Sequence, residues 1–168
     1  MDRLSEIAIK RPERVPFVTQ RIFTWTKVIH GWASFELASE GVAAYRTTVG
    51  DSTDVFRVLL VSILGVLNGE ERQECSFDNE PGEIRLVLES SQPLLNIRIE
   101  RHDEWGKGAG KVQWSARNID ARAFAADVLM STVDLMEKAG VKHFQELWPA
   151  YPYPQAEVDQ VKRVLAVS

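Results

Sequence analysis

The chain has 168 residues, of which 45% are hydrophobic and 26% are charged, and this is typical of one folded domain spanning 1–168. Its formal net charge of −4 argues against a nucleic-acid-binding protein, which needs a clustered positive surface. The single cysteine, Cys75, excludes an intramolecular disulfide and favours a reducing compartment, so we expect a cytoplasmic protein.

The first third of the chain predicts an arm and then strands. Residues 1–16 carry mixed charges and two prolines, which is typical of an N-terminal arm or a short helix and not of a secretory signal. Loose alternation of apolar residues over 21–29 predicts a strand. The β-type segments 32–39 and 42–49 flank Glu40-Gly41, a pair that favours a hairpin turn.

A helix is predicted next, from a cap at Asp51 or Ser52 to a stop at Gly69. Its surface is apolar over most of the circumference, which indicates a buried helix that crosses a sheet. The apolar stretch from Val55 to Leu67 is too short for a bilayer, which needs ~20 apolar residues, so we expect no membrane insertion.

Segment 70–83 is acidic, with six carboxylates and one arginine. Within it, Glu80-Pro81-Gly82 predicts a turn, because proline fixes φ at the second turn position and glycine accepts a positive φ. We interpret the segment as a solvated connection, and an additional strand over 72–77 remains open.

The clearest pattern is the alternation of apolar and polar residues over 83–90, 94–102 and 111–118. A period of two is typical of antiparallel strands with one buried and one wet face. It predicts a three-stranded antiparallel meander, in which Val112 shares the buried face with Trp114.

Charge predicts the register between the first two strands of this meander. One register places Arg85 opposite Arg98 and Glu83 opposite Glu100, and like charges directly opposite one another cost stability. The alternative places Arg85 opposite Glu100 and Glu83 opposite His102. We therefore predict the second register.

The last part of the chain predicts helices. A long helix runs over 119–139, with Asn118 or Asp120 as its cap and Gly140 as its stop. Its polar stripe includes Asp134, which is spaced for an ion pair with Lys138. A short helical turn is expected over 142–148 and a last helix over 156–166.

Together these elements predict an α+β fold. Its antiparallel sheet has about six strands, a hairpin followed by a meander, and the helices pack mainly on one face.

Motifs that carry chemistry are missing from the sequence. The glycine-rich segment 105–112 lacks the hydroxyl residue of a Walker loop, because Val112 follows Gly110-Lys111. His30, His102 and His143 lie far apart along the chain, so we predict neither a metal site nor a cofactor. No catalytic residue can be named, which disfavours an enzyme without excluding one.

The layout resembles small uncharacterised bacterial proteins, including the immunity proteins that neutralise polymorphic toxins. The resembling pieces are the helix end Leu67-Asn68-Gly69, the turn Asp78-x-Glu80-Pro81-Gly82, and the late Phe144 and Trp148-Pro149. The resemblance covers roughly residues 32–150. It implies tight protein binding rather than catalysis.

The leading hypothesis is a non-catalytic protein-binding module, an immunity-like inhibitor of a basic bacterial toxin. Acidic charge steers a cationic partner, and an exposed aromatic side chain anchors an interface. The residues expected to bind the partner are Glu70, Glu71, Glu74, Asp78, Glu80 and Trp105. Two alternatives remain open: a small-ligand-binding protein or enzyme with a pocket between sheet and helices, and a subunit that self-associates into a homo-oligomer.

Overall fold

The computed structural model describes residues 20–167, so the arm expected at 1–16 lies outside the described residues. The first half contains β1 (Phe23–Ile29), β2 (Trp32–Ser39), β3 (Val42–Gly50), α1 (Val55–Leu67) and β4 (Arg72–Asn79). The second half contains β5 (Gly82–Ser91), β6 (Leu94–His102), β7 (Lys111–Asp120), α2 (Ala121–Ala139), α3 (Val141–Leu147) and α4 (Gln155–Ala166). This order confirms the α+β class.

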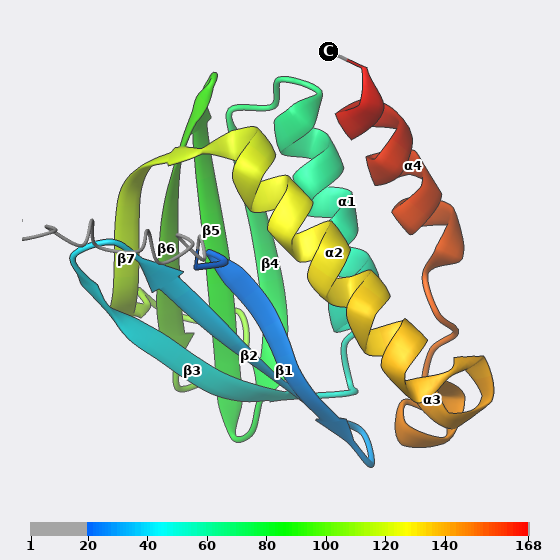
Figure 1. Ribbon diagram of the computed structural model, residues 1–168. Helices are drawn as coiled ribbons and strands as arrows, with labels where there is room; N and C mark the ends of the chain where they lie inside the picture. Colours follow the sequence, from blue (N-terminus) through cyan, green and yellow to red (C-terminus); the bar gives the residue numbers. More distant parts are fainter. Residues whose placement is uncertain (1–19, 168) are drawn as a thin grey trace, which may run out of the picture.

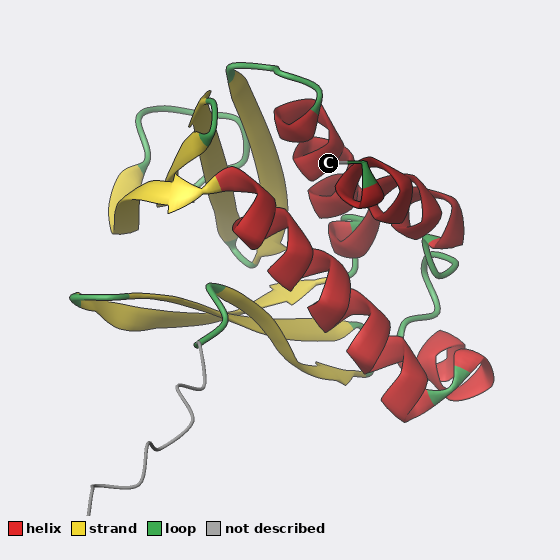
Figure 2. Cartoon of the chain, turned by 45° about the horizontal axis from the view of Figure 1, so that its top comes forward, coloured by secondary structure: helices red, strands yellow, loops and turns green. Residues whose placement is uncertain are grey.

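The strands form two antiparallel sheets, where the sequence had suggested one. The first sheet has the order β1-β2-β3 and the second the order β4-β5-β6-β7. The two sheets lie crosswise, and α1 and α2 run side by side along their open side, with α4 outside them (Figures 1 and 2). The chain leaves the first sheet through α1, so β3 and β4 are separated by a helix instead of a hairpin.

The predicted meander and its register are confirmed. Strands β5, β6 and β7 pair in sequence, and Arg85 lies opposite Glu100 while Glu83 lies opposite His102. Opposite charges therefore meet across the β5–β6 ladder, as expected from the cost of like-charge pairs.

The acidic segment forms a strand and is not a solvated loop. Residues 72–79 pair with β5 as strand β4, and the predicted turn at Glu80-Pro81 joins the two strands in a hairpin. Cys75 and Phe77 point into the core, which explains the pairing, because they supply the apolar face that a strand needs beside β5.

One apolar core fills the space between the two sheets and helices α1 and α2. Leu59 of α1 and Leu86 of β5 are fully buried in it. The helix caps differ in part from expectation. The Asp54 side chain, rather than Asp51 or Ser52, caps α1, whereas Asp120 caps α2 as one of the two predicted choices.

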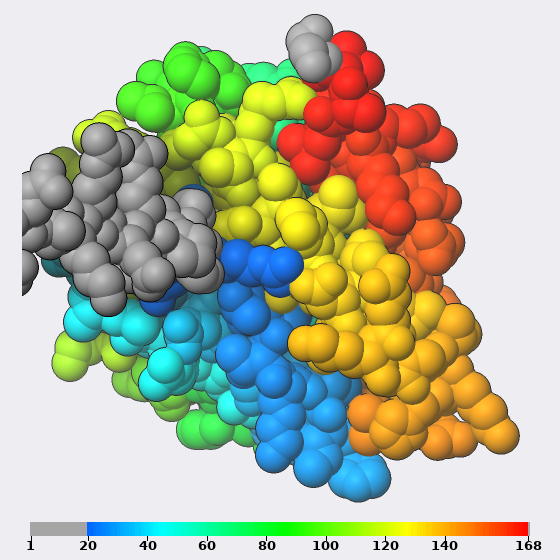
Figure 3. Space-filling model, viewed as in Figure 1, coloured from blue at the N-terminus to red at the C-terminus, as the bar shows by residue number. Residues whose placement is uncertain are grey.

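Helix α2 uses its polar stripe to cover the edge of β1, which it adjoins in Figure 3. The Trp25 N–H donates to Ser131 Oγ at 2.6 Å, and the Ile22 N–H donates to Asp127 at 2.6 Å. Asp134 pairs with Arg21 at 2.8 Å, so the predicted pair with Lys138 is replaced by a tertiary contact. The stripe therefore satisfies backbone donors that an edge strand would leave unpaired.

Candidate protein-binding surface

The residues expected to bind a partner lie at two opposite ends of the four-stranded sheet. Glu70 and Glu71 precede β4 and are exposed at one end. Glu80 lies at the other end, in the β4–β5 turn. Trp105 belongs to the β6–β7 loop at that same end and is 44% exposed. The structure thus brings Glu80 and Trp105 to one end and separates them from Glu70 and Glu71.

Two other predicted residues do not offer free negative charge. Glu74 pairs with Arg72 at 2.5 Å and with Arg85 at 3.9 Å. Asp78 is only 5% exposed, and its backbone N–H donates to Thr53 Oγ1 at 3.0 Å. Asp78 therefore does not contribute to an exposed acidic patch, a correction to the prediction.

The outer face of the four-stranded sheet carries a continuous chain of ion pairs. In order of contact, its members are Glu83, Arg85, Glu74, Arg72, Glu89, Arg98, Glu100 and His102. The same face of the sheet includes Val87, which is fully buried although it does not belong to the core cluster. Arginine charges thus neutralise Glu74 and Glu83 of the acidic segment, and Glu89 and Glu100 beside it, and the arginine stems cover apolar surface.

The two terminal members of this series of ion pairs, Glu83 and His102, are buried together beneath the β6–β7 loop. Glu83 and His102 lie opposite each other and are 1% and 3% exposed. Burial would raise the pKa of Glu83, but hydrogen bonds from Arg85, Gly106 and Ser76 together lower it. The Gly106 N–H donates to Glu83 at 3.2 Å, so this carboxylate anchors the loop that carries Trp105.

The same enclosure keeps this group away from any reactant. The Gly110 backbone lies so close to the His102 ring that an added Cβ would meet Nε2 at 2.3 Å. His102 Nδ1 is buried and has no hydrogen-bond partner among the described residues. A general base must reach the proton that it abstracts, so the geometry favours a structural role for Glu83 and His102.

Other chemistry has little support in the part of the chain that the structure describes. Burial raises the pKa of the Cys75 thiol to about 12, against the opposing effect of its hydrogen bond to Ser62 Oγ at 3.0 Å. A buried neutral thiol is a poor nucleophile. Residues 20–167 contain no group of three or more His, Cys, Asp or Glu side chains that could hold a metal ion. No described helix is long and apolar enough to cross a membrane.

A groove between α1 and α4 has a volume of about 510 Å³. Its lining residues are Val61, Leu64, Gly65, Asn68, Glu70, Gln73, Gln160, Arg163 and Val164. None of these is a histidine, cysteine or serine. The groove therefore lacks a serine or cysteine nucleophile and a histidine base.

The edges of the two sheets are treated unequally. Helix α2 covers the β1 edge, and α1 packs along β4, where the Asn79 side chain also donates to the Thr48 carbonyl at 2.7 Å. By contrast, β3 is an edge strand of the first sheet and β7 is an edge strand of the second. Neither has a second ladder partner within residues 20–167. Unpaired edges present backbone donors and acceptors to any extended chain.

These two edges meet along a groove, which we call the seam groove. It has a volume of about 420 Å³ and is lined by Val42, Ala43, Ala44, Tyr45, Val112, Gln113, Trp114 and Ser115. Its lining is uncharged, and burial raises the pKa of Tyr45, which stays neutral. The Trp114 indole N–H donates to the Ala43 carbonyl at 2.9 Å and ties the two edges together.

Sequence reasoning missed this surface because a β-bulge reverses one residue. The β6–β7 register shifts between Ile99 and Glu100, so Val112 pairs opposite Glu100 on the outer face. Val112 is therefore 52% exposed, whereas the alternation had placed it with Trp114 in the core. Nothing in the local sequence marks this shift.

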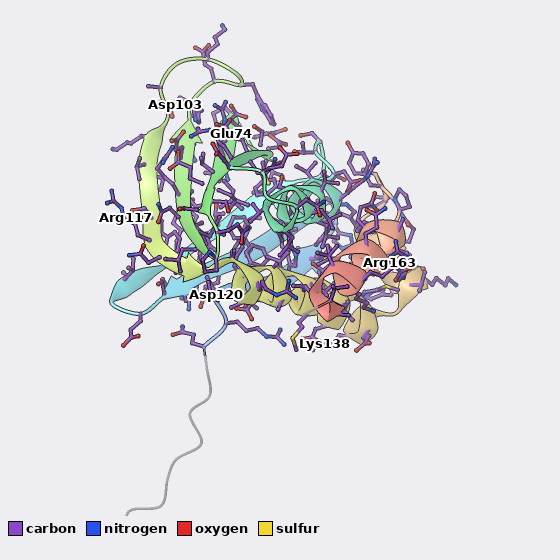
Figure 4. The ribbon with its side chains drawn as sticks, turned by 90° about the horizontal axis from the view of Figure 1, so that it is seen from above. Glu74, Asp103, Arg117, Asp120, Lys138 and Arg163 are labelled. Atoms are coloured by element: carbon purple, nitrogen blue, oxygen red, sulfur yellow. The ribbon has the colours of Figure 1, made fainter. Side chains whose placement is uncertain are left out.

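Two exposed basic side chains lie on β7, the strand that forms one wall of the seam groove. Lys111 and Arg117 of β7 are exposed, and neither forms an ion pair with a described residue. Arg117 projects outward from β7, on the side of the molecule away from Lys138 and Arg163 (Figure 4). The arginines of the outer face are different, because Arg72, Arg85 and Arg98 each contact a carboxylate.

Comparison of the chain with protein-family profiles, with curated proteins and with solved structures finds no match.

Proposed function

We propose that this chain is a non-catalytic protein-binding module whose binding surface is the seam groove. One observation carries the proposal: two sheet edges without a second partner flank an uncharged groove, while the other two edges are covered. Backbone groups at an open edge can pair with another protein, and exposed apolar side chains beside them add contact area. The enclosed state of Cys75, Glu83 and His102 supports binding over catalysis.

The test places a photo-crosslinking amino acid at position 112 and, as a control, at position 61, in the whole chain expressed in its source organism. Val112 and Val61 are 52% and 48% exposed, so the two sites are matched in accessibility. We expect one protein to crosslink at 112 and not at 61. Val112→Asp should abolish its capture, whereas Val61→Asp should leave it unchanged.

The same protein crosslinking equally at both positions, or surviving Val112→Asp, would reject the seam groove as the binding surface. Capture with no dependence on either valine would point instead to another face.

A second candidate function, an immunity-like inhibitor of a basic toxin, would use a different surface and is favoured by a different observation. Glu80 and Trp105 share one exposed end of the sheet, and the Asp103 side chain beside them is 96% exposed. Glu80→Lys should then slow association and flatten its salt dependence, and Trp105→Ala should speed dissociation. Unchanged kinetics in both variants would remove this end of the sheet from the interface.

A further inference from the structure

We infer that the partner adds an extended segment to the free edge of β7, with acidic residues five positions apart, one on each face of the added strand, opposite Lys111 and Arg117. This inference rests on the proposed function and specifies the partner's chemistry at the same surface. It is carried by the backbone, the lining and the charge of the seam groove.

One side of β7 has no strand paired to it within the described residues. β7 pairs with β6 along one side, and its other side faces the seam groove. Side chains of α2 accept hydrogen bonds from the backbone along the β1 edge. The fold therefore contains helices that cover a sheet edge, and the β7 edge is open although such elements are present. An added strand would supply the main-chain hydrogen bonds that the β7 edge lacks.

The lining argues for an apolar middle in the added segment. Val112 and Val42 are 52% and 39% exposed, and they lie on the two walls of the groove. Side chains of a strand alternate between its two faces, so alternate residues of the partner can contact these valines. A charged residue in the middle of the segment would lose solvent without gaining a counter-charge.

Two exposed basic side chains, Lys111 and Arg117, lie on β7. Lys111 opens the strand opposite Arg101, and Arg117 follows six residues later, beyond the bulge that turns Val112 outward. Because the bulge adds one residue, the two side chains lie on opposite faces of the sheet, about five regular strand positions or ~17 Å apart. Both are exposed and lack an ion pair within the described residues, whereas Arg72, Arg85 and Arg98 are all paired. Carboxylates at matching positions of the partner would pair with these two side chains, as carboxylates already pair with the arginines of the outer face.

A second copy of the chain fits this edge less well. Antiparallel pairing of two β7 strands would bring two lysines and two arginines into one ladder, and β7 has no carboxylate between Lys111 and Arg117 to offset them. Charged side chains and bulges also protect edge strands from unwanted pairing. The experiment must therefore distinguish an edge that accepts one kind of strand from an edge that accepts no strand.

The probes are three synthetic nine-residue peptides of alternating valine and threonine. The first has glutamate at its second and seventh positions, which face opposite sides of an extended peptide, and the second has lysine there. The third repeats the glutamate peptide with alternate backbone amides N-methylated, which removes donors and keeps the charge. Each is titrated into the whole isotope-labelled chain and followed by NMR.

We expect the glutamate peptide to shift the Trp114 indole signal and to slow amide exchange along β7. The lysine and N-methylated peptides should bind at least tenfold more weakly. The double change Lys111→Glu with Arg117→Glu should reverse the preference to the lysine peptide. The control double change Lys138→Glu with Arg163→Glu, on the opposite side of the molecule, should leave it unchanged.

Equal binding of the three peptides, binding that maps away from β7, or no binding would overturn the inference. So would sedimentation showing that the chain alone dimerises through β7. If no peptide binds but Val112→Asp still abolishes crosslinking of the natural partner, the proposed function stands and strand addition fails. If both experiments fail, the seam groove is not the binding surface.

Discussion

Glu83 is the residue on which the greatest number of polar contacts converge beneath the β6–β7 loop. It lies opposite His102, bonds to Arg85 at 2.5 Å and accepts from the Gly106 N–H at 3.2 Å. Burial opposes ionisation, but these hydrogen bonds outweigh it and lower the pKa of the carboxyl. Charge-assisted hydrogen bonds in a shielded position are stronger than neutral ones, so Glu83 both stabilises the sheet and holds the loop.

Glu83→Gln should therefore lower the free energy of unfolding at pH 7 by about 1.5–3 kcal/mol, the range for a hydrogen bond to a charged group. A carboxyl with a lowered pKa in the folded chain contributes stability that is fully present above its ordinary pKa of 4.5. That contribution disappears as pH falls through the lower folded pKa, so the two proteins should converge at acid pH. Urea melts across this pH range measure the difference.

The exposed Glu80 supplies the control, because Glu80→Gln should change the free energy of unfolding by less than about 0.5 kcal/mol. Asp54 and Asp127 have a raised pKa because of burial, and they shift stability in the opposite direction. Only the difference between variant and parent isolates Glu83. A difference that does not shrink as pH falls below 4.5 would contradict the assignment.

At the scale of elements, α2 does more than cover the core. Its apolar face includes Phe124 and Val128, which are buried, while Ser131 on the adjoining stripe accepts from the Trp25 N–H. Thr132 next to it accepts from the Trp25 indole at 3.2 Å. The helix thus completes the hydrogen bonding of an edge strand with buried polar side chains.

Ser131→Ala should leave the buried Trp25 N–H without an acceptor and cost about 1–3 kcal/mol of unfolding free energy. The Trp25 amide should also exchange faster with solvent, which hydrogen-exchange NMR measures residue by residue. Ser34→Ala is the control, because that hydroxyl bonds Thr48 on the exposed face of the first sheet. Equal protection of the Trp25 amide in both variants would refute the proposed edge cover.

At the scale of the whole molecule, two crosswise sheets depend on a few polar ties where their edges approach. The Asn79 side chain donates to the Thr48 carbonyl at 2.7 Å and accepts from Arg101 at 2.5 Å. The Trp114 indole makes the corresponding tie to Ala43. The first hydrogen bond joins β3 to β4, and the second joins β3 to β7. Strand β3 is therefore fixed to both edge strands of the second sheet.

Asn79→Ala should remove the first tie and lower the free energy of unfolding by about 0.5–1.5 kcal/mol, because the hydrogen bond is exposed and water can replace the lost donor. Gln113→Ala, an exposed change on β7, should cost less than about 0.5 kcal/mol. Denaturant melts of both variants give the comparison. Equal effects of the two substitutions would mean that the sheets are held together by the apolar core alone.

The sequence by itself determined the features that depend on neighbours along the chain. Alternation over 83–90 and 94–102 located two strands, and the charges of Arg85 and Glu100 predicted their register correctly. Helix ends at Asp120 and Gly140 followed from capping preferences. Period, turn and cap are local properties, because each is set within about four residues.

Only the tertiary structure decided the features that depend on distant residues. The acidic segment became strand β4, and Arg85 and Arg98 neutralised carboxylates from neighbouring strands. The bulge in β7 turned Val112 outward, and a helix residue 106 positions away covered the β1 edge. The seam groove exists only because two sheets cross, and this arrangement is set by how one shared core is filled rather than by any local pattern.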